Sequence, residues 1–308
     1  QDRRDGLRPE EGGDLHGALV KAVAGFPFRS KFHTVEGVKL AYVDQGRGEP
    51  VVLLHGNPTW GYLYRKFIPP LARTNRVIVP DHMGFGRSDK PLDPSRYRLA
   101  RHITNLESLL LKLDVQSATL AMQDWGGPIG LGFAVRHPHR VKRLIIMNTW
   151  AWVIPAGTRI HPLLEQFRQP GVGEALIQGL NLFVEGFLPA GIHKKERVTA
   201  ALMRAYRAPF PDWNSRVGVL AFPRDIVVGD DHPSAPAMHE IAQKLPSLKV
   251  PVLLIWAMKD PAFPKAMIGL WQKLYPHAQL HTLEQAGHFL QEDEPERIVE
   301  LMREFLKR

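Results

Sequence analysis

The chain has 308 residues, 44% of them hydrophobic and 23% charged, which suits one large α/β domain with an insertion or two domains. It contains no cysteine, which excludes disulfides, a thiolate nucleophile and zinc–thiolate sites. The net charge of +9 could attract nucleic acid or an anionic membrane, but the basic residues are scattered and form no Lys/Arg block, so we predict a basic solvated surface and no nucleic-acid partner.

The N-terminal segment is charged and rich in glycine, and we predict an irregular arm over residues 1–25. This arm lacks the hydrophobic core of a signal peptide. No apolar run anywhere in the chain approaches the roughly 18 residues that a membrane span needs. These features predict a protein without a membrane segment and with a cytoplasmic location.

The segment that follows the arm predicts a β-sheet. Residues 32–46 alternate apolar and polar side chains around Glu36-Gly37, which indicates a hairpin with its turn at that dipeptide. Two apolar runs with β-branched residues, Val51–Leu54 and Val77–Val79, are typical of strands that are covered on both faces. Residues 93–115 carry apolar side chains at helical spacing and predict a helix.

The same alternation continues toward the C-terminus. Leu144–Met147 and Val252–Trp256 are apolar runs that predict buried strands, and residues 278–291 predict a last strand and a loop. Residues 295–308 form an amphipathic pattern that predicts a closing helix. Strands that alternate with helices indicate an α/β fold with a mostly parallel sheet and right-handed crossovers.

One long segment breaks this alternation. Residues 150–225 are rich in proline, glycine and aromatic residues, with helical stretches and no clear strand. We predict a helical cap over residues 150–225 that lies above the strand ends, where ligands of α/β proteins bind. The core would then consist of residues 1–149 and 226–308.

The stretch at residues 119–130, with sequence TLAMQDWGGPIG, carries the first chemical signal. It predicts a buried strand, a sharp turn at Gly126-Gly127 and a helix, which is the arrangement of a nucleophile elbow with Asp124 at its tip. A serine needs a base to become nucleophilic, whereas a carboxylate is already ionised at neutral pH. A carboxylate attacks amides and esters weakly, but it can displace a stabilised leaving group from saturated carbon.

Further polar residues follow the predicted strands. His288 comes after the last strand, Asp260 after Val252–Trp256, and Asn57 after Val51–Leu54, while Trp125 directly follows Asp124. The chain order of nucleophile, acid and base is the order of α/β-hydrolases. Each residue also has a structural interpretation: helix capping for Asp124, loop bracing for Asn57, core packing for Trp125, a surface turn for Asp260, and an ordinary loop histidine for His288.

At this point the sequence resembles the haloalkane dehalogenases of the α/β-hydrolase superfamily. The resemblance covers the chain from about residue 30 to the end and is weak through the predicted cap. The matching pieces are HGNPTW at 55–60, PDHMGFGRSDKP at 80–91, QDWGG at 123–127, the loop with Asp260, and AGHF at 286–289. Met122 departs from the general elbow pattern, in which a small residue stands two places before the nucleophile.

The resemblance implies an α/β-hydrolase fold with a mostly parallel central sheet, flanking helices and a helical cap. It implies hydrolysis of haloalkanes with a triad of Asp124, His288 and Asp260 and a halide-binding pair of Asn57 and Trp125. Some family members carry a Glu where this chain has Asn148, which cannot act as an acid. The implied partners are a small apolar halogenated substrate and a halide ion, without a metal or cofactor; a homo-oligomer is a further candidate assembly.

Two other classes of function stay open. An epoxide hydrolase would use the same Asp–His–Asp triad, but it needs an acid for the epoxide oxygen, usually cap tyrosines, and residues 150–225 contain only Tyr206. A non-catalytic binder would keep the scaffold for ligand sensing, although a decayed site is expected to lose a triad member. A luciferase-type oxygenase also uses this scaffold, but nothing in the sequence singles it out.

Overall fold

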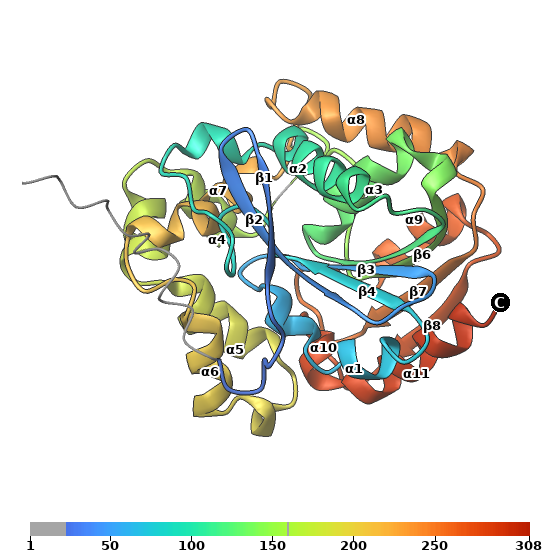
Figure 1. Ribbon diagram of the computed structural model, residues 1–308. Helices are drawn as coiled ribbons and strands as arrows, with labels where there is room; N and C mark the ends of the chain where they lie inside the picture. The colour runs from blue at the N-terminus through green and yellow to red at the C-terminus, as the bar shows by residue number, and fades with distance from the viewer. Residues whose placement is uncertain (1–22, 159) are drawn as a thin grey trace, which may run out of the picture.

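The computed structural model describes residues 23–158 and 160–308, so that most of the predicted N-terminal arm lies outside the described residues. Eight strands form one sheet in the order β1-β2-β4-β3-β5-β6-β7-β8 (Figure 1). The strands are β1 (Lys31–Val35), β2 (Val38–Gln45), β3 (Pro50–Leu54), β4 (Arg76–Pro80), β5 (Ala118–Gln123), β6 (Val141–Met147), β7 (Val252–Ala257) and β8 (Gln279–Leu283).

The α-helices lie between these strands and after them. They are α1 (Ile68–Leu71), α2 (Leu99–Lys112), α3 (Gly126–Arg136), α4 (Pro162–Arg168), α5 (Leu188–Gly191), α6 (Ala200–Arg207), α7 (Val217–Asp225), α8 (Ala235–Lys244), α9 (Ala266–Leu274), α10 (Leu290–Asp293) and α11 (Pro295–Leu306). Short 3₁₀ helices include Gly61–Tyr64 and Pro94–Tyr97, and two short π-helices cover Glu174–Gly179 and Phe183–Phe187.

The strand pairing confirms the predicted α/β class. β1 and β2 form the antiparallel hairpin, and its turn places Glu36 and Gly37 at positive φ angles of 45° and 76°. From β4 to β8 every neighbouring pair is parallel, and β5 and β7 are buried along their whole length. Burial on both faces explains why these strands are continuous apolar runs in the sequence.

Helices cover both faces of the sheet (Figure 1). α2, α3 and α8 pack together on one face, and α1 and α11 lie on the other. The amphipathic pattern of the C-terminus forms α11, whose apolar side chains are buried while the intervening charged ones face solvent. Among residues 23–158 and 160–308, no helix combines the length and apolar character needed to cross a bilayer.

A group of helices lies between β6 and β7 in sequence and beside the sheet in space. α4, α5, α6 and α7 gather there, whereas α8, which follows them, returns to the sheet and packs on α3 (Figure 1). The last residue of α7 is Asp225. The division into a core of residues 1–149 and 226–308 and a cap of 150–225 stays a prediction, and these positions support it.

Candidate active site

The elbow around Asp124 is as sharp as its sequence suggests. β5 ends at Gln123, α3 begins at Gly126, and Asp124 between them has a φ of 51°, in the left-handed region. A Cβ on Gly126 would lie 2.3 Å from the carbonyl oxygen of Leu54 in β3, and a Cβ on Gly127 would lie 1.8 Å from Oγ1 of Thr149. Only glycine fits at both positions, so the two glycines allow the tight turn that follows Asp124.

The Asp124 carboxylate is held by backbone N–H groups. Asn57 N donates to its Oδ1 at 2.8 Å, and the N–H of Trp125 also donates to the carboxylate. Burial raises the pKa of the carboxyl, and His288 and the two N–H groups only partly offset this effect. Asn57 N thus holds Oδ1, while Oδ2 points toward His288.

His288 lies between two carboxylates. Its Nδ1 is 3.0 Å from Oδ2 of Asp260, and its Nε2 is 3.7 Å from Oδ2 of Asp124. Burial opposes protonation of His288, but Asp260 and Asp124 outweigh it and raise the pKa of the imidazole to about 9. Phe263 stacks on one face of the ring at 5.7 Å between centroids, and Phe289 contacts it edge-on.

Asp260 is the most enclosed member of the three. Its side chain is fully buried, and Oδ1 accepts hydrogen bonds from the N–H groups of Ala262 at 2.7 Å and Phe263 at 3.3 Å. Burial would raise the pKa of this carboxyl, but His288 and these N–H groups outweigh it and lower the pKa. The structure therefore brings Asp124, His288 and Asp260 together from three separate loops; their catalytic roles remain a proposal.

The two predicted halide donors share a neighbour, helix α7. Asn57 Nδ2 donates to the carbonyl oxygen of Val219 at 3.1 Å, which leaves its second amide hydrogen for another acceptor. The indole of Trp125 stacks on Phe222 with 4.6 Å between centroids and an interplanar angle of 11°. Trp150 meets the same indole in a T-shaped contact at 5.0 Å. The hydrogen bond therefore braces Asn57, and the aromatic contacts pack Trp125, in addition to any role of the two residues in halide binding.

Three further polar residues lie near the site, and the sequence predicted a contact there for none of them, although it marked Asn148 as a position where some family members carry a Glu. Gln123 contacts His288 through its amide, and Asn148 donates to Oδ2 of Asp260 at 3.0 Å. Asp293 is buried and accepts from the N–H of Gly287, beside the base, and from two N–H groups of the segment after α5. The position of Gln123 directly before Asp124 in the sequence is a signal from which its contact with His288 could have been predicted.

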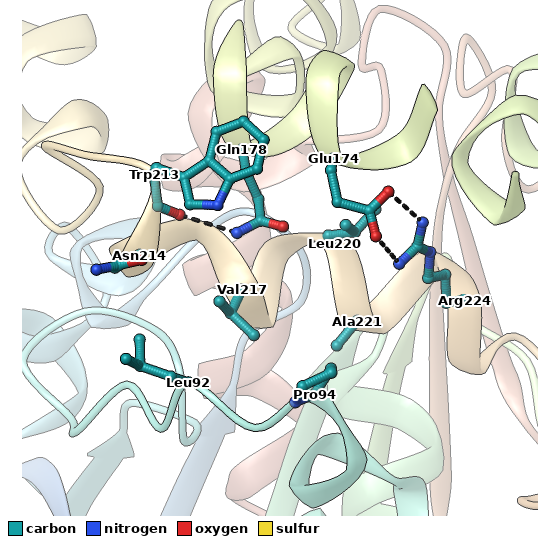
Figure 2. Close-up of a pocket in the computed structure, with 10 residues that line it drawn as sticks. All are labelled: Leu92, Pro94, Glu174, Gln178, Trp213, Asn214, Val217, Leu220, Ala221 and Arg224. Atoms are coloured by element: carbon teal, nitrogen blue, oxygen red, sulfur yellow. Dashed lines mark hydrogen bonds and ion pairs between the residues drawn. The ribbon is translucent and has the colours of Figure 1, made fainter. Parts of the chain in front are cut away.

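A separate pocket of about 260 Å³ lies beside α7 (Figure 2). Leu220 and Arg224 of α7, Glu174 and Trp213 lie around it, and Glu174 forms two hydrogen bonds with Arg224. None of the five predicted site residues lines this pocket. It is therefore distinct from the cluster of Asp124, His288 and Asp260.

The comparisons with known proteins agree with this architecture. Residues 49–295 match the family model of the alpha/beta hydrolase fold. A cis-3-alkyl-4-alkyloxetan-2-one decarboxylase of Shewanella oneidensis is 38% identical over 283 residues, covering 91% of this chain and 89% of the relative. A haloalkane dehalogenase of Psychrobacter cryohalolentis is 37% identical over 276 residues, covering 87% of this chain and 88% of the relative.

Solved structures give the same grouping. The crystal structure of a haloalkane dehalogenase from Bradyrhizobium elkani has a TM-score of 0.83 and 32% identity, and the similarity covers 91% of this chain and 98% of that one. The predicted resemblance is thus confirmed, while the decarboxylase relatives were not among the alternatives that the sequence raised. The chain belongs to the α/β hydrolase fold family, among relatives that include haloalkane dehalogenases and cis-3-alkyl-4-alkyloxetan-2-one decarboxylases.

Proposed function

We propose that this protein hydrolyses haloalkanes to an alcohol, a halide ion and a proton through an ester on Asp124. The observation that carries the proposal is the position of the Asp124 carboxylate, with one oxygen held by Asn57 N at 2.8 Å and the other 3.7 Å from Nε2 of His288. A cytoplasmic location and a homo-oligomeric assembly stay predictions from the sequence.

In the first step, Oδ2 of Asp124 attacks the carbon that bears the halogen. A carbon–oxygen bond forms while the carbon–halogen bond breaks, and the halide leaves with the bonding electron pair. The indole N–H of Trp125 and the free amide hydrogen of Asn57 are suitable donors for this anion. Loss of one donor in a dry site costs about 3 kcal/mol of barrier.

In the second step, water attacks the carbonyl carbon of the ester while His288 accepts its proton as general base. The tetrahedral intermediate then collapses: the bond between that carbon and Oδ2 of Asp124 breaks, and the alcohol leaves with the proton held by His288. The second proton of the water goes to solvent as the Asp124 carboxylate forms again. The N–H groups of Asn57 and Trp125, which already hold the carboxylate, would stabilise the tetrahedral oxyanion. Esterification also removes the negative charge of Asp124, one of the two charges that raise the pKa of His288. The pKa of the imidazole therefore falls in the intermediate, when the base is needed.

The test is halide release from a bromoalkane by wild-type protein and two variants. Asp124→Asn should release no halide, and His288→Gln should release about one halide per protein and gain the mass of one alkyl group. Asp114→Asn is a matched control, because Asp114 also has a positive φ, 45°, but is 80% exposed at the surface. Halide turnover by Asp124→Asn would refute the assignment of the nucleophile.

A second candidate function is decarboxylation of a cis-3,4-dialkyl oxetan-2-one, which the 38% identity to the Shewanella decarboxylase favours. Asp124 would attack ring carbon 4 and release the ring oxygen as a carboxylate, another anion for the same two donors. That carboxylate would then leave as carbon dioxide, its bonding electrons forming the alkene and expelling Asp124. This route consumes no water, so His288→Gln should still turn over the lactone, while its haloalkane turnover stops after one halide.

The epoxide hydrolase alternative receives less support from the site. The hydroxyl of Tyr206 donates to Oε1 of Glu292 at 2.5 Å, so it is already engaged elsewhere. Burial, together with the Glu292 charge, raises the pKa of this phenol well above its ordinary value. We expect turnover of a bromoalkane to exceed that of an aryl epoxide; the opposite ranking would favour the epoxide hydrolase.

A further inference from the structure

Gln123 contacts the proposed base, His288, from the strand that leads to the proposed nucleophile. It is the last residue of β5, directly before Asp124, and its side chain is completely buried. Its amide nitrogen Nε2 lies 3.1 Å from the carbonyl oxygen of His288 and 3.3 Å from Nε2 of the same histidine. One side chain therefore contacts both the backbone and the ring of the proposed base.

The carbonyl contact determines which way the amide faces. A carbonyl oxygen can only accept a hydrogen bond, so the atom beside it must be the nitrogen of Gln123 and not its oxygen. The second hydrogen of that nitrogen is then directed toward Nε2 of His288. Nε2 can accept this hydrogen only if it carries a lone pair, which places the ring proton on Nδ1, facing Asp260.

The opposite orientation of the Gln123 amide would make the contact with the carbonyl oxygen of His288 unfavourable. It would place Oε1 of Gln123 against the carbonyl oxygen of His288, and two acceptors repel each other. In the observed orientation, Oε1 is buried and has no hydrogen-bond partner among the described residues.

The charged groups around His288 raise its pKa, whereas a donor at Nε2 would lower it. Asp124 on the elbow and Asp260 after β7 both favour a protonated ring, and the groups stacked on it, Phe263 and Phe289, are uncharged. Asp293 lies across the loop and accepts the N–H of Gly287. Burial of the ring opposes the two carboxylates, and an amide that donates to Nε2 acts in the same direction as burial.

We propose that Gln123 is a positioning residue for the base: its amide disfavours a proton on Nε2 of His288, so that this nitrogen is free to accept one from water. The inference rests on the proposed function, in which His288 acts after Asp124 has lost its charge. The contact of 3.3 Å is long for a hydrogen bond, so a water can replace it. Because His288 accepts a proton only during ester hydrolysis, Gln123 affects that step and not the attack of Asp124.

The experiment follows the titration of His288 by ¹⁵N NMR without substrate. Asp124→Asn removes the nucleophile's charge as esterification would, and Gln123→Met is added to it because methionine has a similar shape without an amide. We expect the double variant to titrate about one pH unit higher than Asp124→Asn, a tenfold change in proton affinity. Gln291→Met in the same background is the control, because Gln291 is also buried but its amide donates to Tyr64.

Equal titration midpoints in the Gln123→Met and Gln291→Met backgrounds would overturn the inference. A wild-type measurement guards against misfolding of the variant: at a pH where His288 is neutral, its ¹⁵N shifts must show Nδ1 protonated and Nε2 bare. With a bromoalkane, the single variant Gln123→Met should hydrolyse the ester about tenfold more slowly at neutral pH. Its hydrolysis rate should recover at higher pH, and the size of its halide burst should equal that of wild type. Because the titration needs no turnover, it stays informative if the dehalogenase proposal fails.

Discussion

The side-chain amide of Asn148 donates a hydrogen bond of 3.0 Å to Oδ2 of Asp260, the oxygen that also faces Nδ1 of His288. Asn148 stands where some haloalkane dehalogenases carry an acid. In this chain it donates to Asp260, the proposed acid. The same amide bonds with both backbone groups of Ala257 at the end of β7. Asn148 therefore links the elbow's neighbouring strand to the proposed acid.

Replacement of Asn148 should affect both stability and hydrolysis. Asn148→Gly keeps the positive φ of 31° accessible but leaves two buried backbone groups without partners, which should cost about 2–4 kcal/mol of unfolding free energy. Denaturant unfolding measures this loss, and single-turnover kinetics should show slower ester hydrolysis. Asn181→Gly is the control, because Asn181 has a similar φ of 53°. An effect no larger than that of the control would contradict the role of Asn148.

Gly56 provides a test of how tightly the nucleophile is held. A Cβ at this position would lie 2.1 Å from Oδ1 of Asp124 and 2.4 Å from its Cβ. Gly56→Ala should therefore displace the carboxylate and lower the rate of halide release by roughly 100-fold, since small misplacements of a reacting group have effects of that size. Gly269→Ala, where nothing lies within 4 Å of the added methyl group, should leave the rate unchanged.

The ion pair of Glu174 and Arg224, beside the pocket next to α7, predicts a pH dependence of stability (Figure 2). The hydrogen bond from Arg224 lowers the pKa of Glu174 to about 2, despite an opposing effect of burial. Because the folded-state pKa lies below the unfolded value, the stabilisation is present above about pH 4.5 and is lost as the pH falls toward 2. Solvent screening limits it to about 1 kcal/mol.

Urea unfolding at pH 7 and pH 3 checks this prediction. Glu174→Gln should be less stable than wild type at pH 7, and the difference should shrink at pH 3. A double-mutant cycle with Arg224→Met isolates the coupling between the two side chains. A difference that stays the same at both pH values would show that Glu174 acts through packing and not through its charge.

A buried charge network predicts a clear ranking of two variants. Arg65 forms two hydrogen bonds of 2.6 and 2.8 Å with Glu292, whose Oε1 also accepts from Tyr206 of α6. Glu292→Gln leaves the Arg65 charge without its partner and should lower the unfolding free energy by about 3–5 kcal/mol. Tyr206→Phe removes one hydrogen bond and should cost about 1–3 kcal/mol. The reverse order in thermal or urea unfolding would refute this ranking.

Much of the fold and of the candidate site could be predicted from local patterns. The apolar runs at Val51–Leu54 and Val252–Trp256 form strands, and they are continuously apolar because both faces of the sheet are covered there. The carboxyl ends of parallel strands share one edge of the sheet, so Asp124, Asp260 and His288, each placed just after a strand, had to come close together.

The sequence by itself determined which residue types follow which strands, and with them the fold, the family and the candidate triad. Only the tertiary structure decided that Gln123 faces the ring of His288, that Asn148 shares an oxygen of Asp260, and that Asn57 bonds to Val219 of α7. The strand pattern is local and repeats every two residues, so one segment is enough to reveal it. Contacts between side chains of distant segments depend on packing to within a few tenths of an ångström, which no single segment contains.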